Sequence, residues 1–322
     1  MAGIRAHRGA AAGLAALALL ACRPAWAGWR EEIGTFRIGM VAEPGAGNAV
    51  PGLALLTDAY SAALGVPVKV FVARDYATLI QAQIDRRVDY AVYSATAYAL
   101  ASVRCGCVEP LVAPTDADGA VGVRSVLVTR DAKVTKPADM ATRRIALGAP
   151  DSVTATLMPL ADLAAAGVTD VAGQPLLRHA ASASAAEAML ADGTVDAVFG
   201  WQRAREAGAQ GTPPRGGTLT RLEAAGIPAS ALQVVWSSGV LRYGPHAVLS
   251  SLDKEAKRRL VDFLTGLKAR APQVYGLLER DHMGGFVAVK ASDYETAAAL
   301  VRAAALEPPP AVTDRARPRS NR

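Results

Sequence analysis

One order of apolar strands and helix-like segments occurs twice along this chain, and it constrains the possible fold more than any other feature of the sequence. The first copy alternates short apolar runs with amphipathic segments: "FRIGMV" (Phe36–Val41), a helix-like run through Tyr60, "VKVFVA" (Val68–Ala73), a segment from Tyr76 to Arg86, and "VDYAVYS" (Val88–Ser94). This β-α-β-α-β alternation is typical of a parallel sheet flanked by helices.

The second copy begins at the strand "RRIALG" (Arg143–Gly148), which a helix follows from about Thr154 to Ala166. The later stretch "AAEAMLADGTVDAVFGW" (Ala185–Trp201) matches "ATLIQAQIDRRVDYAVYS" (Ala77–Ser94), because each has an Ala/Leu-rich helix, a turn, Val-Asp and an apolar strand. The shared Val-Asp is short enough to arise by chance, so the inference depends on the order of the elements. We interpret the chain as a duplicated lobe.

The connecting segments predict how the two lobes are joined. Extended candidates lie at Asp118–Arg130 and Leu232–Tyr243, and helices from Lys254 to Ala271 and Asp293 to Ala304 return to the first lobe. We therefore expect lobe 1 at 28–121 and 237–306, with lobe 2 inserted at 122–236. Two crossings form a hinge, and ligands of such α/β sheets bind in a cleft at the carboxyl ends of the strands.

The first 27 residues have the features of an export signal. Arg5 and Arg8 precede the apolar run Gly9–Ala21, and "AWA" ending at Ala27 has the small-x-small form of a cleavage site. The apolar run is shorter than the about 20 residues of a membrane span. We expect cleavage before Gly28 and a periplasmic location. The alternatives are a lipoprotein anchored through Cys22 and a cytosolic protein with an Ala-rich first helix.

The net charge of +6 does not describe the folded body. Three arginines lie in the segment expected to be removed, and the Arg-rich tail from Ala311 to Arg322 carries three further net positive charges. The body is therefore close to neutral, without the basic patch that a nucleic-acid-binding domain requires. The Pro- and Arg-rich tail, 307–322, is expected to be disordered.

Cysteine and histidine are too sparse to predict a metal site. Beyond Cys22 the chain holds one Cys105-Gly-Cys107 with no histidines clustered around it, and a structural metal site needs more ligands. A disulfide and two free thiols both stay open for this pair. We expect no metal and no cofactor.

The loop after the strand Arg143–Gly148 has the chemistry of an anion site. In "GAPDSVTATLMP" the hydroxyls of Ser152, Thr154 and Thr156 follow one another at the start of a helix. The first backbone N–H groups of a helix have no intrahelical acceptor and attract negative charge. The alternative is plain capping of the helix by Asp151 or Ser152, with nothing bound.

At these motifs the chain resembles the substrate-binding proteins of phosphate/phosphite/phosphonate ABC importers. The resemblance covers about Phe36 to Ala305, and its most specific part, "DSVTATLMP", is similar to the family's D-P-x-S-T-S-G-x-x-x-P loop. Other matches are "RDYATLIQAQIDRRVDYA", "YSATAYALA", "VRSVLVTRDA", Arg178-His179, "VVWSS" and "GGFVAVKASDY". The resemblance implies an α/β, two-lobed type 2 periplasmic binding protein fold, each lobe a mainly parallel sheet flanked by helices, with two hinge crossings.

The resemblance also implies a ligand site and a function. The matched positions, with Ser94 facing the same cleft mouth, are Tyr76, Ser94, Tyr98, Ser125, Ser152, Thr154 and His179. The implied function is an exported, monomeric receptor that closes around a small phosphonate-, phosphite- or phosphate-like oxyanion and delivers it to an ABC permease in the inner membrane. Each residue also has a structural alternative: a cap for Tyr76 or Ser94, core packing for Tyr98, and a ladder position for Ser125.

Three departures from the family pattern concern the ligand. Val153 and Ala155 stand where the family loop usually has Thr and Gly, so one hydroxyl is lost and a Cβ could crowd an oxyanion. Trp201 stands where polar residues are common, either over the pocket or at the edge of the lobe. A different small organic anion is therefore an alternative ligand.

Two other functional classes are alternatives to a transport receptor. An enzyme is not expected, because there is no G-x-S-x-G, no H-E-x-x-H and no third glycine after Gly45-Ala-Gly47. A ligand-presenting sensor or accessory protein would use the same fold, and no signalling module is fused to this chain.

Overall fold

The structure is a computed structural model, and it describes residues 28–42, 52–140, 143–150, 152–165, 177–206, 208–210 and 214–306. The predicted signal peptide and the predicted disordered tail lie outside these residues. The chain divides into two compact units, 1–34 and 35–322. The first contributes the short helix α1 (Trp29–Ile33), and the second contains two separate β-sheets.

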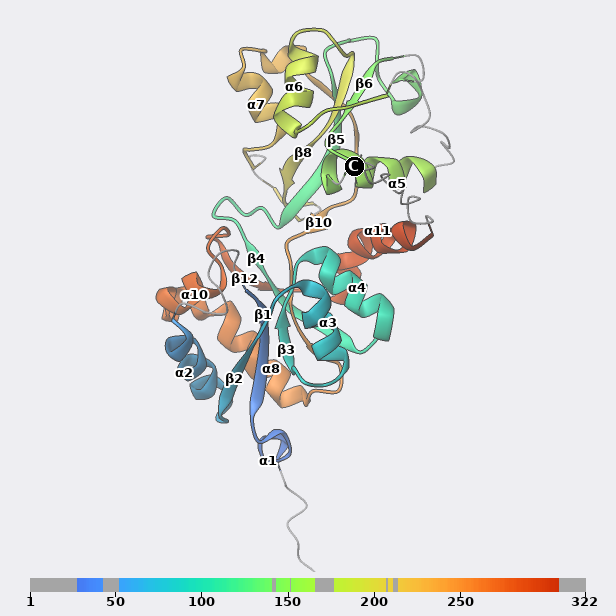
Figure 1. The fold of residues 1–322 in the computed structure, drawn as a ribbon. Coiled ribbons are helices and arrows are strands. Elements are labelled where there is room, and N and C mark those ends of the chain that lie inside the picture. The colour runs from blue at the N-terminus through green and yellow to red at the C-terminus, as the bar shows by residue number, and fades with distance from the viewer. Residues whose placement is uncertain are drawn as a thin grey trace, which may run out of the picture. The chain divides into compact units, whose positions relative to one another are not determined.

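The first sheet has six strands in the order β12-β4-β11-β3-β1-β2 (Figure 1). Strand β1 is parallel to β2 and β3, whereas β11 is antiparallel to β3 and β4, and β12 is antiparallel to β4. The strands are β1 (Phe36–Val41), β2 (Val68–Ala73), β3 (Tyr90–Val92), β4 (Val108–Thr115), β11 (His246–Leu249) and β12 (Gly285–Ala288). The predicted bounds of β1 and β2 are confirmed.

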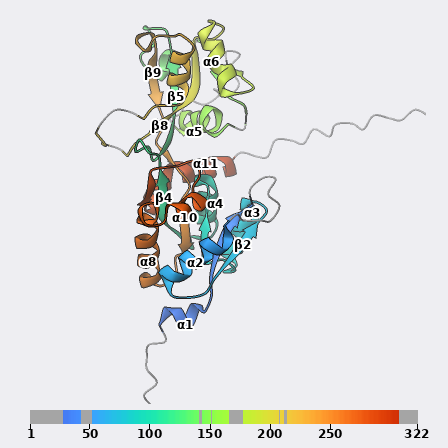
Figure 2. The same cartoon turned by 90° about the vertical axis from the view of Figure 1, so that its left-hand side faces the viewer.

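Helices pack on both faces of the first sheet. On one face, three helices and the strands form one buried cluster that is rich in Ala and Leu. The helices are α3 (Tyr76–Ile84), α4 (Ala95–Cys105) and α11 (Glu295–Leu306), and the short turn η4 (Ala291–Tyr294) precedes α11. Helices α2 (Leu53–Leu64), α8 (Lys254–Thr265), α9 (Leu267–Arg270) and α10 (Pro272–Leu278) form the other layer, where α2 contacts α8 and α10 (Figure 2). In that layer Tyr60 packs edge-on against Tyr90 and Phe263.

The second sheet repeats this plan. Strand β6 is parallel to β7 and β8, and β5 is antiparallel to β8, β9 and β10. Its strands are β5 (Gly122–Thr129), β6 (Ile145–Leu147), β7 (Leu177–His179), β8 (Ala197–Ala204), β9 (Gln233–Ser237) and β10 (Leu241–Arg242). Helices α6 (Ala183–Ala191) and α7 (Thr218–Ala224) cover one face, and the turns η1 (Pro137–Met140) and η3 (Ala229–Ala231) lie in its loops.

The duplication is visible in side chains as well as in strand order. Asp89, just before β3, accepts from the backbone N–H of Arg37 at 2.9 Å and from its guanidinium Nε at 2.9 Å and Nη2 at 2.7 Å. Asp196, just before β8, accepts from the same three groups of Arg144 at 2.8, 3.2 and 2.8 Å. The repeated Val-Asp therefore performs one task twice: a charge-assisted fork fixes the middle of three parallel strands, β1 or β6, to the following strand, β3 or β8.

The second predicted extended segment, Leu232–Tyr243, is two strands instead of one. The break falls at Ser238, whose Oγ accepts a hydrogen bond of 2.9 Å from the Ser125 N–H. The side chain takes the place of a backbone acceptor there, so the ladder with β5 is interrupted after Ser237 and resumes at Leu241. Both β9 and β10 belong to the second sheet, and the chain returns to the first sheet through Tyr243, Gly244 and Pro245. The domain boundaries given above stay predictions.

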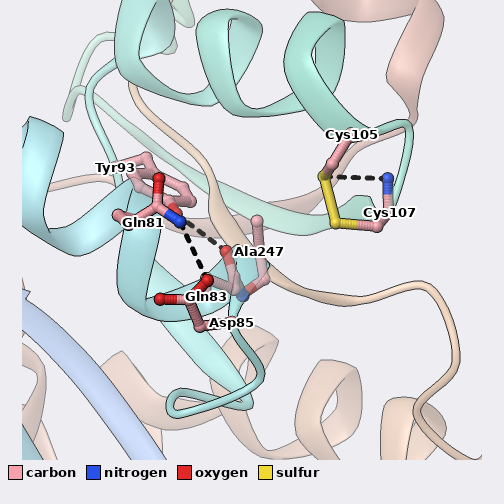
Figure 3. Close-up of a disulfide and its surroundings, with 7 residues drawn as sticks. All are labelled: Gln81, Gln83, Asp85, Tyr93, Cys105, Cys107 and Ala247. Carbon is pink, nitrogen blue, oxygen red and sulfur yellow. Dashed lines mark hydrogen bonds between the residues drawn. A yellow bond between two sulfur atoms is a disulfide. The ribbon is translucent and has the colours of Figure 1, made fainter.

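The Cys105-Gly-Cys107 pair is a disulfide, with an S–S distance of 2.08 Å and Cα atoms 5.0 Å apart (Figure 3). Gly106 between the two cysteines has φ 58°, a left-handed value that favours glycine. The bridge links the end of α4 to the strand β4 and packs against the core of the first sheet. Nearby, the buried Gln83 accepts from the Tyr93 hydroxyl at 2.8 Å. A disulfide is typical of proteins in an oxidising compartment.

Removing this disulfide is expected to have a small effect on stability. A bridge acts mainly by restricting the unfolded chain, and a ring closed over a single intervening residue restricts it little. Replacing Cys105 and Cys107 together by serine should lower the free energy of unfolding by about 1.5 kcal/mol. Urea unfolding followed by far-UV circular dichroism would measure it, and a loss above about 4 kcal/mol would show that the bridge does more than close its short loop.

Candidate functional site

The predicted anion loop begins directly after β6. The Ser152 Oγ accepts a hydrogen bond of 3.3 Å from the Ala155 N–H, so the capping expected at this position is present. The next turn, η2 (Val153–Leu157), is π-helical, because the Leu157 N–H bonds to the Ser152 carbonyl at 2.9 Å. It leads into α5 (Met158–Ala165). π-Helical turns are rare and are often found at functional sites.

The π-helical turn leaves backbone donors at its start. Among the described residues, no hydrogen-bond acceptor is found for the N–H groups of Val153 and Thr154. The Thr154 hydroxyl likewise has no partner among them, and the residue is partly exposed. These three donors lie at the positive end of the helix, where an anion would be stabilised. Besides the helix cap that Ser152 provides, the loop therefore has hydrogen-bond donors that an anion could accept from.

Three buried contacts hold the loop on its strand. The Thr156 hydroxyl donates to the Ala149 carbonyl at 2.9 Å, and the Gly148 N–H donates to the Ala155 carbonyl at 3.1 Å. The Ala155 methyl faces Gly148, since a Cβ built there would lie 2.7 Å from it. Ala155 is 1% exposed. The Cβ of Ala155 thus packs the loop against the strand. It points toward Gly148, so in this position it does not crowd an oxyanion as the sequence suggested it could.

A methyl group at Gly148 is therefore expected to displace the loop. Gly148→Ala should lower the free energy of unfolding by about 1–3 kcal/mol, because overpacking moves η2 away from β6. Gly276→Ala is the matched control, since a Cβ at Gly276 in α10 meets nothing within 4 Å. That control should be neutral or stabilising. Thermal unfolding of both variants checks the prediction, and equal effects would contradict it.

Ser125 on β5 lies behind the loop and fixes its backbone. The Ser125 hydroxyl donates to the Thr154 carbonyl, and its own N–H donates to Ser238. Ser125 is fully buried and Ser238 is 7% exposed. The family resemblance in the sequence implied Ser125 as a site residue but not Ser238. The signal for Ser238 was the Ser-Ser pair at the end of "VVWSS".

His179 reaches the same loop from the end of β7. Its Nδ1 lies 3.0 Å from the Gly148 carbonyl, and this contact makes Nδ1 the donor. The ring is exposed, and Nε2 has no partner among the described residues. Ser125, Ser152, Thr154 and His179 are therefore brought together around the carboxyl end of β6.

Trp201 is the neighbour of Ser125 across the sheet, paired with it in the β5–β8 register. The Arg221 guanidinium carbon lies 5.1 Å from the centre of the Trp201 ring, a cation–π distance. Arg221 is in turn held by two hydrogen bonds of 2.7 and 2.6 Å to the buried Glu187. Trp201 lies on the central strand β8 and is held there by Arg221 of α7, which Glu187 of α6 anchors.

Two of the three predicted residues of the first sheet, Tyr76 and Ser94, form a second group. Ser94 caps α4 by accepting from the Ala97 N–H at 3.2 Å. Tyr76, at the start of α3, is 40% exposed. Burial raises the pKa of Tyr76, hydrogen bonding with Ser94 opposes the rise, and the nearby Glu279 adds to it. Tyr76 and Ser94 therefore lie together at the carboxyl edge of the first sheet.

Tyr98 is placed differently from the other candidates. It is 2% exposed, and its ring packs edge-on against Tyr294 with centroids 4.9 Å apart. Burial raises the pKa of Tyr98 to about 12, and Ser102 opposes this slightly without making a well-formed hydrogen bond to the hydroxyl. In this conformation the hydroxyl is not exposed to a ligand. Within the described residues no hydrogen bond joins the first-sheet group to the second-sheet group.

The described parts of the chain hold no cluster of three metal-ligating side chains. They also contain no helix of the length and apolarity that a bilayer crossing requires.

The two sheets, their strand orders and the two crossings define a binding protein of the type 2 periplasmic class. The sequence profile described as "ABC transporter, phosphonate, periplasmic substrate-binding protein" matches residues 38–294. The chain belongs to this family. The family resemblance inferred from the loop motif is confirmed, and so is the α/β two-lobed fold class. The family consists of transport substrate-binding proteins and is not an enzyme family.

The chain is similar to several solved structures, and the two below with TM-scores of 0.52 and 0.58 agree with this fold. A binding protein of an ABC phosphonate transporter from Pseudomonas aeruginosa is 24% identical, with 81% of this chain and 83% of that one covered and a TM-score of 0.42. XAC2383 from Xanthomonas citri, bound to chloride, is 16% identical, with 84% and 99% covered and a TM-score of 0.52. Transferrin 1 from Manduca sexta is 11% identical, with 84% and 46% covered and a TM-score of 0.58. The sequences of characterised proteins gave no match.

Family membership carries three general consequences. The protein binds a small ligand, it is periplasmic, and its partner is a membrane permease.

Proposed function

We propose that this protein captures a small phosphonate-like oxyanion at the loop after β6 and delivers it to an ABC permease. The observation that carries the proposal is the set of donors at the start of η2: two backbone N–H groups and the Thr154 hydroxyl, all without an acceptor among the described residues. Donors to a charged acceptor make strong hydrogen bonds even where no cation is present.

The residues around these donors fit the same task. Ser125 and Thr156 tie the backbone of the loop in place, so the donors are ordered before a ligand arrives. Such preorganisation lowers the entropic cost of binding. The exposed Nε2 of His179 adds a donor or an acceptor, according to its protonation.

The first sheet would complete the site on closure. Tyr76 and Ser94 present hydroxyls at the carboxyl edge of that sheet, which is where ligands of such sheets bind. Hinge closure would bring them to the oxyanion held by Ser152 and Thr154. Tyr98 would support this group from behind and would contact the ligand only after a change of side-chain position.

A thermal-shift screen tests the proposal. The protein would be expressed as the full chain, purified after export and stripped of ligand by partial unfolding and refolding. It would be offered phosphate, phosphite, methyl- and aminoethylphosphonate, sulfate, sulfonates and carboxylates. A ligand at about 100 times its Kd stabilises the folded state by about 2.7 kcal/mol. A clear shift with a phosphorus oxyanion supports the proposal, and compaction in solution scattering would support closure.

The alternative ligand is another small organic anion, which Val153 favours because it replaces a hydroxyl by an apolar surface in the loop. In that case the phosphorus oxyanions would leave the melting temperature unchanged and a carboxylate or sulfonate would raise it. A role as a sensor or accessory protein, or lipid attachment through Cys22, would appear in the co-purified partner and in the mass of the mature chain.

A further inference from the structure

A buried carboxylate lies where the chain crosses from the first sheet to the second. Asp116 follows the last residue of β4, and its side chain is 5% exposed. Its backbone closes a turn, with its N–H bonded to the Ala120 carbonyl at 2.8 Å and its carbonyl accepting from Gly119 at 2.9 Å. The carboxylate is therefore held in the first crossing, 116–121, close to the start of β5.

Four segments of the chain meet at this one carboxylate. From the second sheet, Arg203 on β8 donates through Nε at 2.8 Å. From the second crossing, the Tyr243 hydroxyl donates to the same oxygen. From the segment between α10 and β12, His282 Nδ1 lies 2.9 Å from the other oxygen. Asp116, which lies in the first crossing, thus contacts Tyr243 of the second crossing, Arg203 of the second sheet and His282, which precedes strand β12 of the first sheet.

The donors are also fixed to one another. The rings of Tyr243 and His282 are stacked, with centroids 3.7 Å apart and planes 23° apart. The Tyr243 N–H donates to the Val121 carbonyl at 3.0 Å, which ties the two crossings together through the backbone as well. The Tyr243 carbonyl accepts from the Tyr294 hydroxyl at 3.0 Å. Movement of either crossing would have to break or rearrange this set of contacts.

We propose that Asp116 is a positioning residue of the hinge, which holds the two crossings in a single arrangement. Any rotation of one sheet against the other changes the distance between Arg203 and His282, and a buried carboxylate cannot lose either partner without a large penalty. The ligand-free protein therefore occupies a narrow range of hinge angles. A role of this constraint in ligand capture rests on the proposed function, whereas the constraint on the hinge angle does not.

Asp118 offers a matched control in the same loop. Its carboxylate pairs with the same Arg203 guanidinium, at 3.2 Å, but its side chain is 36% exposed. Asp116→Asn and Asp118→Asn make the same change of charge two residues apart, and only the first removes the buried acceptor that both crossings share. Tyr243→Phe removes one donor to Asp116 without changing charge, and keeps the ring that stacks on His282.

The experiment measures hinge angles without any ligand. Lys69→Cys in β2 and Glu223→Cys in α7 place one spin label on an exposed position of each sheet's layer. Cys22→Ser removes the remaining thiol, since Cys105 and Cys107 form a disulfide. Pulsed electron paramagnetic resonance would give the distance distribution between the labels in protein expressed as the full chain and purified after export. Hydrogen exchange would report on 116–121 and 243–245.

Asp116→Asn is expected to broaden the distance distribution or add a second population, and to speed amide exchange in both crossings. The exchange should rise by about tenfold or more, the factor expected when hydrogen bonds to a charged group are lost. Asp118→Asn should behave like the parent protein. The proposal is overturned if folded Asp116→Asn matches the parent, or if both variants broaden equally. Should Asp116→Asn fail to fold, Tyr243→Phe decides by the same criteria.

Discussion

Asp89→Ala is expected to lower the free energy of unfolding by about 2–4 kcal/mol, because it removes a buried charged acceptor of three hydrogen bonds. Asp89 has a side chain only 7% exposed and accepts three hydrogen bonds from Arg37. Its loss leaves the backbone N–H of Arg37 without an acceptor at the start of the first parallel strand pair. Urea unfolding followed by circular dichroism would measure the change.

The repeat in the second sheet supplies the matched comparison. Asp196 makes the same three contacts with Arg144, but its side chain is 25% exposed. Water can replace part of the hydrogen bonding between Asp196 and Arg144. Asp196→Ala should therefore lower the free energy of unfolding by only about 1–2 kcal/mol. Equal losses in the two variants would contradict the view that burial, and not the repeated fork, decides the size of the effect.

Acid should remove the contribution of Asp196. The hydrogen bond from the Arg144 side chain lowers the pKa of Asp196 below its ordinary value of 3.8. A lowered pKa means that the contribution is complete above that ordinary value and is lost as the pH falls through the folded-state pKa. The difference in unfolding free energy between the parent and Asp196→Ala should thus be constant from pH 7 to pH 5 and shrink below about pH 4. A constant difference down to pH 2 would contradict this assignment.

The sequence predicted the parallel strands β1 and β2 well because buried parallel strands are continuous apolar runs. "FRIGMV" and "VKVFVA" became β1 and β2 with the predicted bounds. The predicted strand Val88–Ser94 was too long, since β3 covers only Tyr90–Val92. Asp89 bonds to Arg37 before the strand, and Ser94 caps α4 after it. Side chains that bond to the backbone end a strand, and hydropathy alone does not show where they will do so.

The site was predictable by residue type but not by geometry. The hydroxyls of "DSVTATLMP" indicated an anion loop, yet the π-helical turn depends on Ala155 packing against Gly148 and on Thr156 bonding to Ala149. The contact between Ser125 and Ser238 joins positions 113 residues apart. No local pattern predicts such contacts. Similarly, the spacing of Cys105 and Cys107 allowed a disulfide or two free thiols, and the structure has the disulfide.

Thr154→Val is expected to weaken binding of the oxyanion identified by the screen by about 10- to 150-fold, with little change in melting temperature. The substitution keeps the shape of the side chain and removes a hydroxyl that has no partner among the described residues. A hydrogen bond to a charged group contributes about 1.5–3 kcal/mol, and each 1.4 kcal/mol is a factor of ten in Kd. Isothermal titration calorimetry would measure the affinity of each variant.

Thr156→Val is the matched control two residues along the same turn. Its hydroxyl donates to the Ala149 carbonyl and is 2% exposed, so it stabilises the loop and does not face a ligand. This variant should lose about 0.5–1.5 kcal/mol of stability, because one hydrogen bond of the loop is lost while the Ala149 carbonyl keeps the Ser152 N–H as a donor. Its Kd should change less than that of Thr154→Val. If Thr156→Val weakens binding more than Thr154→Val, the hydroxyls of this loop act by ordering its backbone, and the oxyanion is held by the N–H groups alone.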